Sequence, residues 1–350
     1  MPSFWTFLSR VRDSNAALTV LVIVAEIFSM GGFASFAMAL PELMASWQLT
    51  SADGGWISGA YYGGYVLAVP FLVGLTDRIE SRRIYVVSCM ISAIGGVGFI
   101  MFAQGLWSAT LFRAVVGVAL AGTYMPGLRV LTERLGERGR LRAIPYYTAS
   151  FGVGVSLSFP ICGWFGQVWG WPAAFWAGVI GPVIAAVIMA LATRPLRAAV
   201  ASESLSFETV ASGLPARHPL DFRPVFSNRA VLSYVFAYGG HCWELFALRA
   251  WMAAFLSFAW NNSIGSIGSI GRDGGGVAWW VSLCVMAGVP ASILGAELAL
   301  HVGRKKLIQR AAWFSVVTGV GAGFATGLPF GVVVALTFFI MLWLRLILGR

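Results

Sequence analysis

Residues 74–83 read Gly74-Leu75-Thr76-Asp77-Arg78-Ile79-Glu80-Ser81-Arg82-Arg83 and separate two long apolar segments, at residues 54–75 and 84–103. Charged side chains are costly inside lipid, so we expect this polar stretch to be a loop in water between two membrane-spanning helices. A related stretch, Gly303-Arg304-Lys305-Lys306, follows another apolar segment in the second half of the chain. The recurrence indicates a protein made of two similar halves.

The composition is typical of a membrane protein, since 58% of the residues are hydrophobic and only 11% are charged. Runs of about 20 apolar residues can cross a hydrocarbon core of roughly 30 Å, and a backbone in lipid satisfies its own polar groups as a helix. The sequence has ten such runs, at residues 16–40, 54–75, 84–103, 106–129, 143–166, 173–193, 229–257, 277–300, 311–328 and 330–348. The predicted fold class is therefore all-α and polytopic.

The positions of the cationic residues predict the orientation in the membrane. The chain has 24 lysine and arginine residues and a net charge of +10. If the N-terminus is cytoplasmic and the ten runs alternate, all of them except Arg113, Arg249 and Arg272 fall on the cytoplasmic side. We therefore expect a multi-pass protein of the plasma (inner) membrane whose basic loops face the cytoplasm. The net positive charge is therefore explained by the orientation of the chain in the lipid bilayer. We expect no nucleic-acid partner.

One long polar connection divides the chain. Residues 194–228 are rich in proline and serine, which is typical of a linker. We predict an N-terminal six-helix bundle at residues 1–193, a cytoplasmic linker at 194–228 and a four-helix C-terminal bundle at 229–350.

Several motifs resemble those of the major facilitator superfamily of secondary transporters. The loop signature of that family, Gly-x-x-x-Asp-Arg-x-Gly-Arg-Arg, is matched by Asp77, Arg78, Arg82 and Arg83, with one extra residue before the arginine pair. A weaker copy keeps Gly303, Arg304 and Lys305 and lacks the acid. The helix-four motif is matched by Arg113 and Gly117, and the antiporter motif Gly-Pro-x-x-Gly-Gly is matched in part by Pro160 and Gly163.

The resemblance implies a fold of two helical bundles that expose a central site alternately to either side of the membrane. It also implies that both charged loops act in gating and that Gly117, Pro160 and Gly163 act in helix packing. The family norm is twelve helices, and this chain supplies ten in a 6 + 4 arrangement. The expectation is therefore a family member without the last two helices, and a transport-inactive remnant is one alternative.

Few ionisable residues lie inside the apolar runs, and each is a candidate for function because burial in a membrane is costly. Glu26 lies near the middle of the first run and is the predicted proton carrier; a role in packing alone is the alternative. Arg113 lies in the fourth run, where it must face a cavity, a carboxylate or backbone carbonyls. Tyr61 and Tyr65 in the second run are candidates to line a substrate pathway with it, although tyrosine also gathers at membrane interfaces.

The seventh run has three ionisable residues. His241 and Glu244 are three residues apart, so they share a helix face and could hydrogen-bond to each other. Histidine changes its charge near neutral pH, so this pair is a second candidate for proton coupling. Arg249 lies on another face and is a candidate for the substrate pathway.

The sequence lacks a nucleotide-binding loop, metal-ligand spacing and a recognisable catalytic arrangement, so we expect neither an enzyme nor a cofactor or metal site. We predict a proton-coupled secondary transporter, acting as a monomer, that exports small organic compounds. The direction rests on the partial antiporter motif. The alternative within transport is an uptake symporter for a small anion, with Arg113 and Arg249 as ligands.

Overall fold

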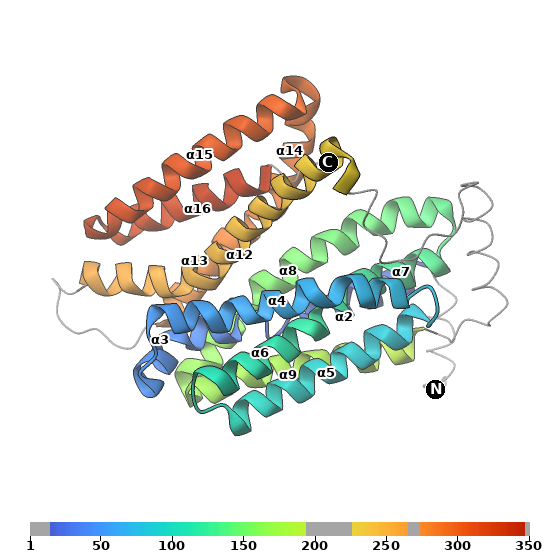
Figure 1. Ribbon diagram of the computed structural model, residues 1–350, viewed down its shortest axis with the longest axis horizontal. Coiled ribbons are helices and arrows are strands. Elements are labelled where there is room, and N and C mark those ends of the chain that lie inside the picture. The colour runs from blue at the N-terminus through green and yellow to red at the C-terminus, as the bar shows by residue number, and fades with distance from the viewer. Residues whose placement is uncertain (1–14, 194–225, 265–273, 347–350) are drawn as a thin grey trace, which may run out of the picture. The chain divides into compact units, whose positions relative to one another are not determined.

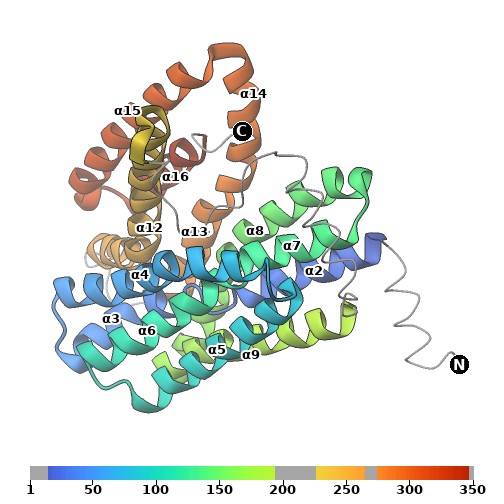
Figure 2. The same cartoon turned by 45° about the vertical axis from the view of Figure 1, so that its right-hand side comes forward.

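The computed structural model describes residues 15–193, 226–264 and 274–346, and within these ranges every regular element is a helix (Figures 1 and 2). This confirms the predicted all-α fold class. In chain order the elements are α2 (Asn15–Ser29), α3 (Ser35–Trp47), α4 (Ser51–Leu75), α5 (Ser81–Phe102), α6 (Leu106–Ala121), α7 (Tyr124–Arg134), α8 (Glu137–Trp169), α9 (Trp171–Ala192), α12 (Arg229–Ile264), α13 (Gly274–Met286), α14 (Gly288–Val302), α15 (Arg304–Phe324), the 3-10 helix η1 (Ala325–Gly327) and α16 (Phe330–Leu346).

Six helical stretches in the described part of the chain are long and apolar enough to cross a membrane. They are Ser51–Leu75, Ser81–Phe102, Leu106–Arg134, Glu137–Trp169, Trp171–Ala192 and Val231–Asn262. Shorter apolar helices lie at Asn15–Ser29, Gly276–Ala291 and Phe330–Leu346. The chain is a multi-pass integral membrane protein. The count of ten spans stays a prediction, and the linker predicted at 194–228 lies almost entirely outside the described residues, as does Arg272.

Three runs predicted as single helices are interrupted in the structure. The run at 16–40 is split into α2 and α3 by turns at residues 30–34, the run at 106–129 into α6 and α7, and the run at 277–300 into α13 and α14. Glycines explain the first two breaks, because glycine weakens a helix and leaves room for another backbone. Gly32 lies so close to the backbone of Gly178 that a Cβ could not be added there. In α14, Pro290 has no N–H to continue the helical hydrogen bonds.

The described residues group into two compact units. The first unit comprises those within Met1–Ser29, Trp56–Phe151 and Val179–Tyr238, and the second comprises those within Met30–Gly55, Gly152–Gly178 and Gly239–Arg350. The predicted division into residues 1–193 and 229–350 stays a prediction.

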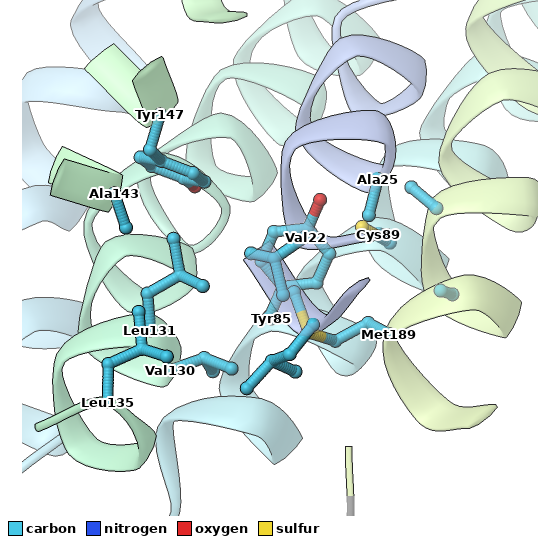
Figure 3. Close-up of a cluster of buried hydrophobic side chains, with 13 residues drawn as sticks. Val22, Ala25, Tyr85, Cys89, Val130, Leu131, Leu135, Ala143, Tyr147 and Met189 are labelled. Atoms are coloured by element: carbon cyan, nitrogen blue, oxygen red, sulfur yellow. The ribbon is translucent and has the colours of Figure 1, made fainter. Parts of the chain in front are cut away.

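Each unit has a hydrophobic core of its own. The core of the first unit joins α2, α5, α7, α8 and α9 through the buried residues Leu18, Val22, Ala25, Tyr85, Cys89, Val130, Leu131, Leu135, Ala143, Tyr147, Ala185, Ala186 and Met189 (Figure 3). In the second unit, Ala322 of α15 packs with Ile340 and Leu344 of α16, and α15 and α16 lie side by side in Figures 1 and 2. These cores hold the helices that carry the candidate site residues.

Small residues let neighbouring helices approach closely, as is common in membranes. Gly117 of α6 faces the main-chain carbonyl of Tyr61 in α4, where a Cβ would overlap that carbonyl. In the second unit, Gly163 of α8 faces Ala278 of α13 and Met38 of α3 in the same way. Pro160 is buried within α8 and does not interrupt the helix. The close approach explains why a glycine is needed at 117.

We expect Gly117→Ala to destabilise the protein by about 1–3 kcal/mol, because the added methyl group must push α4 and α6 apart. Gly59→Ala in α4 is the matched control, since a Cβ at Gly59 meets no atom within 4 Å. The control should be neutral or slightly stabilising, because alanine favours a helix. Thermal unfolding of the purified proteins in detergent gives the comparison. Equal melting temperatures would show that the two helices separate at no cost.

Candidate functional site

Glu26 is fully buried in the first unit, where α2 faces α8. Its Oε2 accepts a hydrogen bond from the Tyr147 hydroxyl at 3.0 Å and a longer one from the Ser29 hydroxyl at 3.4 Å. Its Oε1 has no hydrogen-bond partner in the described part of the chain. A carboxyl group in this position has one firm partner, and that partner is neutral.

The surroundings of Glu26 are apolar. Tyr85 and Cys89 of α5 lie within electrostatic reach of the carboxyl group, and both belong to the buried core drawn in Figure 3. Among the described residues, Glu26 forms no ion pair. A buried charge without a counter-charge is costly. The arrangement therefore suits a group that can gain and lose a proton rather than one that holds a permanent ion pair.

Arg113 and Tyr61, both predicted for the substrate pathway, lie together in the first unit. The Arg113 guanidinium carbon is 4.1 Å from the centre of the Tyr61 ring, and both side chains are buried. A cation over an aromatic face is stabilised by the ring quadrupole. The Tyr61 ring also packs edge-on against Tyr62, and Tyr65 is partly exposed. The structure thus places a buried cation beside an aromatic side chain.

In the second unit, His241 and Glu244 do not form the hydrogen bond that their spacing allowed. His241 is buried, and neither of its ring nitrogens has a hydrogen-bond partner among the described residues. Glu244 is exposed and accepts a hydrogen bond from Ser315 of α15 instead. The carboxylate of Glu244 thus takes its donor from a neighbouring helix.

Arg249 is 1% exposed, with its guanidinium carbon 5.7 Å from the centre of the Phe33 ring. His241 lies within electrostatic reach of both Arg249 and Arg345. Two arginines therefore lie near His241 in the second unit. Together they favour a bound anion over a bound cation.

The loop at residues 76–80 is tied to α7 by a network of charged groups. Arg129 of α7 forms an ion pair of 2.6 Å with Asp77, donates to the Thr76 hydroxyl and contacts Glu133 at 2.9 Å. Arg134, also in α7, contacts Glu80 at 3.0 Å. These bonds hold the loop against one short helix.

The other residues predicted for the gating loops vary in their surroundings. Arg82, in the first turn of α5, donates to the carbonyl of Ala190 in α9 at 2.9 Å, which ties the start of α5 to α9. Arg78 and Arg83 are exposed. In the second loop, Gly303 has a positive φ of +86° between α14 and α15, and Lys305 is exposed. The side chain of Arg304 lies outside the described residues.

Sequence reasoning missed three groups that build this site. Tyr147 follows another tyrosine at 146 with no pattern that marks it, and Arg129 and Glu133 show only the spacing of an ordinary helical ion pair. Their partners are 121 and 52 residues away in sequence. Only the packing of α7 and α8 brings them to Glu26 and Asp77.

Comparison with known proteins is consistent with this geometry. The family model described as Major Facilitator Superfamily matches residues 22–349. The chain is 26% identical over 153 residues to the niacin transporter NiaP of Acinetobacter baylyi, covering 44% of this chain and 35% of that protein. It is 24% identical over 156 residues to the D-galactonate transporter of Escherichia coli O6:H1, covering 45% and 36%. The matched region thus covers about a third of the length of each of these two relatives.

The fold also matches a solved structure. The crystal structure of a bacterial homolog to the human lysosomal transporter Spinster, in an inward-facing and occupied conformation, superposes with a TM-score of 0.72 at 15% identity. The match covers 95% of this chain and 73% of that one. At this identity the likeness shows the fold.

The two arginines that contact Glu80 give a matched test of the loop network. Arg134→Gln should lower the free energy of unfolding by about 3–5 kcal/mol, because both side chains of its ion pair with Glu80 are nearly buried and a carboxylate would lose its counter-charge. Arg83→Gln should change it by less than about 1 kcal/mol, because the Arg83 side chain is 70% exposed and 3.7 Å from the same carboxylate. Unfolding of both variants in detergent measures these free energies. Equal losses would contradict the prediction that the buried ion pair contributes more to stability than the exposed one.

Proposed function

Because this chain belongs to the Major Facilitator Superfamily, we propose that it transports small organic molecules across a membrane by alternating access and couples this movement to protons. The family and its relatives are transporters rather than enzymes, and the relatives compared above are named for niacin and D-galactonate. Export is the proposed direction, supported by the partial antiporter motif with Pro160 and Gly163. The cationic loops support a plasma (inner) membrane location with the N-terminus in the cytoplasm.

The buried carboxyl group of Glu26 carries the proposal of proton coupling. It is 0% exposed, bonded to the neutral Tyr147 hydroxyl and surrounded by apolar side chains. A proton can therefore serve in place of a counter-ion when the group is shut away from water. Glu26 would take up a proton when its site opens to one side and release it when the site opens to the other.

The ion pair between Asp77 and Arg129 supports a gating role for the first charged loop. It joins the loop after α4 to α7, so any rearrangement of these helices must stretch or break it. An interaction present in one access state and absent from another biases the equilibrium between the two. Asp77 and Arg129 would therefore stabilise the state in which this loop is closed.

Uptake of a small anion is the second candidate function. Arg113 in the first unit and Arg249 in the second unit are buried and permanently charged, and Arg345 is a further arginine of the second unit. Niacin and galactonate both carry a carboxyl group, which such residues can bind as an anion. Proteoliposomes with an entrapped pH-sensitive dye distinguish the candidates: export by exchange moves protons against the substrate, and symport moves them with it. Radiolabelled niacin and D-galactonate are the first probes.

Glu26→Gln should abolish accumulation driven by a pH gradient and still allow downhill exchange of substrate. Glutamine keeps the size and the hydrogen-bonding ability of the side chain but cannot titrate. Glu26→Asp should retain coupling with a changed pH optimum. Reconstituted protein assayed with and without a pH gradient gives both measurements.

Asp53→Asn is the matched control for Glu26→Gln, because Asp53, in the first turn of α4, is a partly exposed carboxylate whose hydrogen bonds within the described residues come from Thr50. It should leave coupling unchanged. If the Glu26→Gln protein still concentrates substrate against its gradient, the proton site lies elsewhere, and His241 and Glu244 become the next candidates. Loss of downhill exchange as well would favour a packing role.

Asp77→Asn should slow transport by several-fold while the amount of protein in the membrane stays unchanged, since the charge that holds Arg129 is removed from an exposed loop. Arg138→Gln is the control and should leave the rate unchanged, because Arg138 is exposed at the start of α8 and belongs to neither charged loop. Initial rates of exchange, normalised to the inserted protein, provide the comparison. Wild-type rates for Asp77→Asn would mean that the loop marks topology and has no part in gating.

A further inference from the structure

The Tyr147 hydroxyl has one hydrogen and two acceptors. Its oxygen lies 3.0 Å from Oε2 of Glu26 and 2.9 Å from the main-chain carbonyl oxygen of Tyr124, the first residue of α7. A phenol can donate only one hydrogen bond at a time. The two acceptors therefore compete for the same hydrogen.

The Tyr147 ring cannot swing to relieve this competition. It is 0% exposed and stacks on the Tyr124 ring, with centroids 5.6 Å apart and planes 25° from parallel. A Cβ at Gly127 of α7 would overlap the Tyr147 hydroxyl, so a glycine there makes room for the oxygen. The ring is fixed, and only the hydroxyl hydrogen can turn.

The groups around Glu26 leave few other places for a proton. The titratable side chains that face it are Tyr147 of α8, and Tyr85 and Cys89 of α5, and Ser29 contributes a hydroxyl from α2 itself. The residues that α7 and α9 bring to the same cluster are aliphatic side chains, Met189 and the partly buried Tyr124, whose ring stacks on Tyr147. Tyr147 is the one of these groups that also reaches the backbone of α7.

We propose that Tyr147 is a positioning residue that transmits the protonation state of Glu26 to the start of α7. When Glu26 is ionised, the Tyr147 hydrogen points to the carboxylate, because hydrogen bonds to a charged group are roughly twice as strong as neutral ones. When Glu26 takes up a proton from water, its own O–H donates to the Tyr147 oxygen. The Tyr147 hydrogen then turns to the Tyr124 carbonyl, and Tyr147 neither gains nor loses a proton.

The consequence falls on the helix that carries the loop network. α7 begins after the break between α6 and α7 and includes Arg129, Glu133 and Arg134. An extra hydrogen bond to its first residue stabilises its first turn only while Glu26 is protonated. This inference rests on the proposed role of Glu26. It adds a chain of contacts within the first unit, from Glu26 through Tyr147 and α7 to the loop at residues 76–80.

Hydrogen–deuterium exchange of the full-length protein in detergent tests the proposal without any substrate. In wild type, a peptide covering residues 124–131 should exchange roughly two- to tenfold more slowly at low pH than at high pH after correction for intrinsic rates, which is the effect of one neutral hydrogen bond. Glu26→Gln mimics the protonated state and should give slow exchange throughout. Tyr147→Phe should give fast exchange throughout.

Tyr85→Phe is the matched control, because it removes a buried phenol beside Glu26 that makes no bond to α7; it should keep the wild-type pH dependence. The proposal is overturned if Tyr147→Phe keeps that dependence or if Tyr85→Phe abolishes it. If Tyr147→Phe cannot be purified, unchanged pH dependence in Glu26→Gln overturns the proposal equally. A protein with this pH-dependent exchange but no proton-coupled transport would refute the proposed function and leave the inference intact.

Discussion

The hydrogen bond between Tyr147 and Glu26 is the contact on which the arrangement of the first unit depends. A carboxyl group among apolar side chains must have a polar partner, and α8 supplies it from 121 residues away. The bond joins α2 to α8, and the Tyr147 ring also packs on α7 through its stacking on Tyr124. The surrounding core, from Leu18 to Met189, is built around this one polar contact.

The loop at residues 76–80 shows how the same unit handles charges that can reach water. Its ion pairs range from the nearly buried Arg134 with Glu80 to the exposed Arg83 with the same carboxylate. Exposed pairs contribute little to stability and are easily broken, whereas buried pairs are costly to break. The gating role that we propose for this loop would need both kinds: a firm attachment at its base and weaker contacts at its surface.

The sequence was sufficient to predict the fold class, because apolar runs of membrane length have few alternatives in lipid. It was also sufficient to pick out Glu26, since an isolated acid in such a run is rare. It could not predict Tyr147 or Arg129 as partners, because no local pattern encodes a contact across 121 or 52 residues. Helical spacing permits a hydrogen bond between His241 and Glu244 without requiring it, and the sequence could not show that the Glu244 carboxylate accepts from Ser315 instead. The break at residues 30–34 could not be predicted from the local sequence, because the close packing at Gly32 involves Gly178, which is far away along the chain.

That break has a consequence for how the chain is made. The described part of α2 has 15 residues and α3 has 13, so each of these stretches is about 20 Å long, shorter than the hydrocarbon core of roughly 30 Å. We therefore expect the insertion machinery to take both as one segment. Gly178, which packs against the bend at Gly32, leaves the ribosome about 150 residues later, roughly 7–30 seconds at common rates of synthesis. The first segment is thus made before its bend has a partner, and the close contact at Gly32 can form only when α9 arrives.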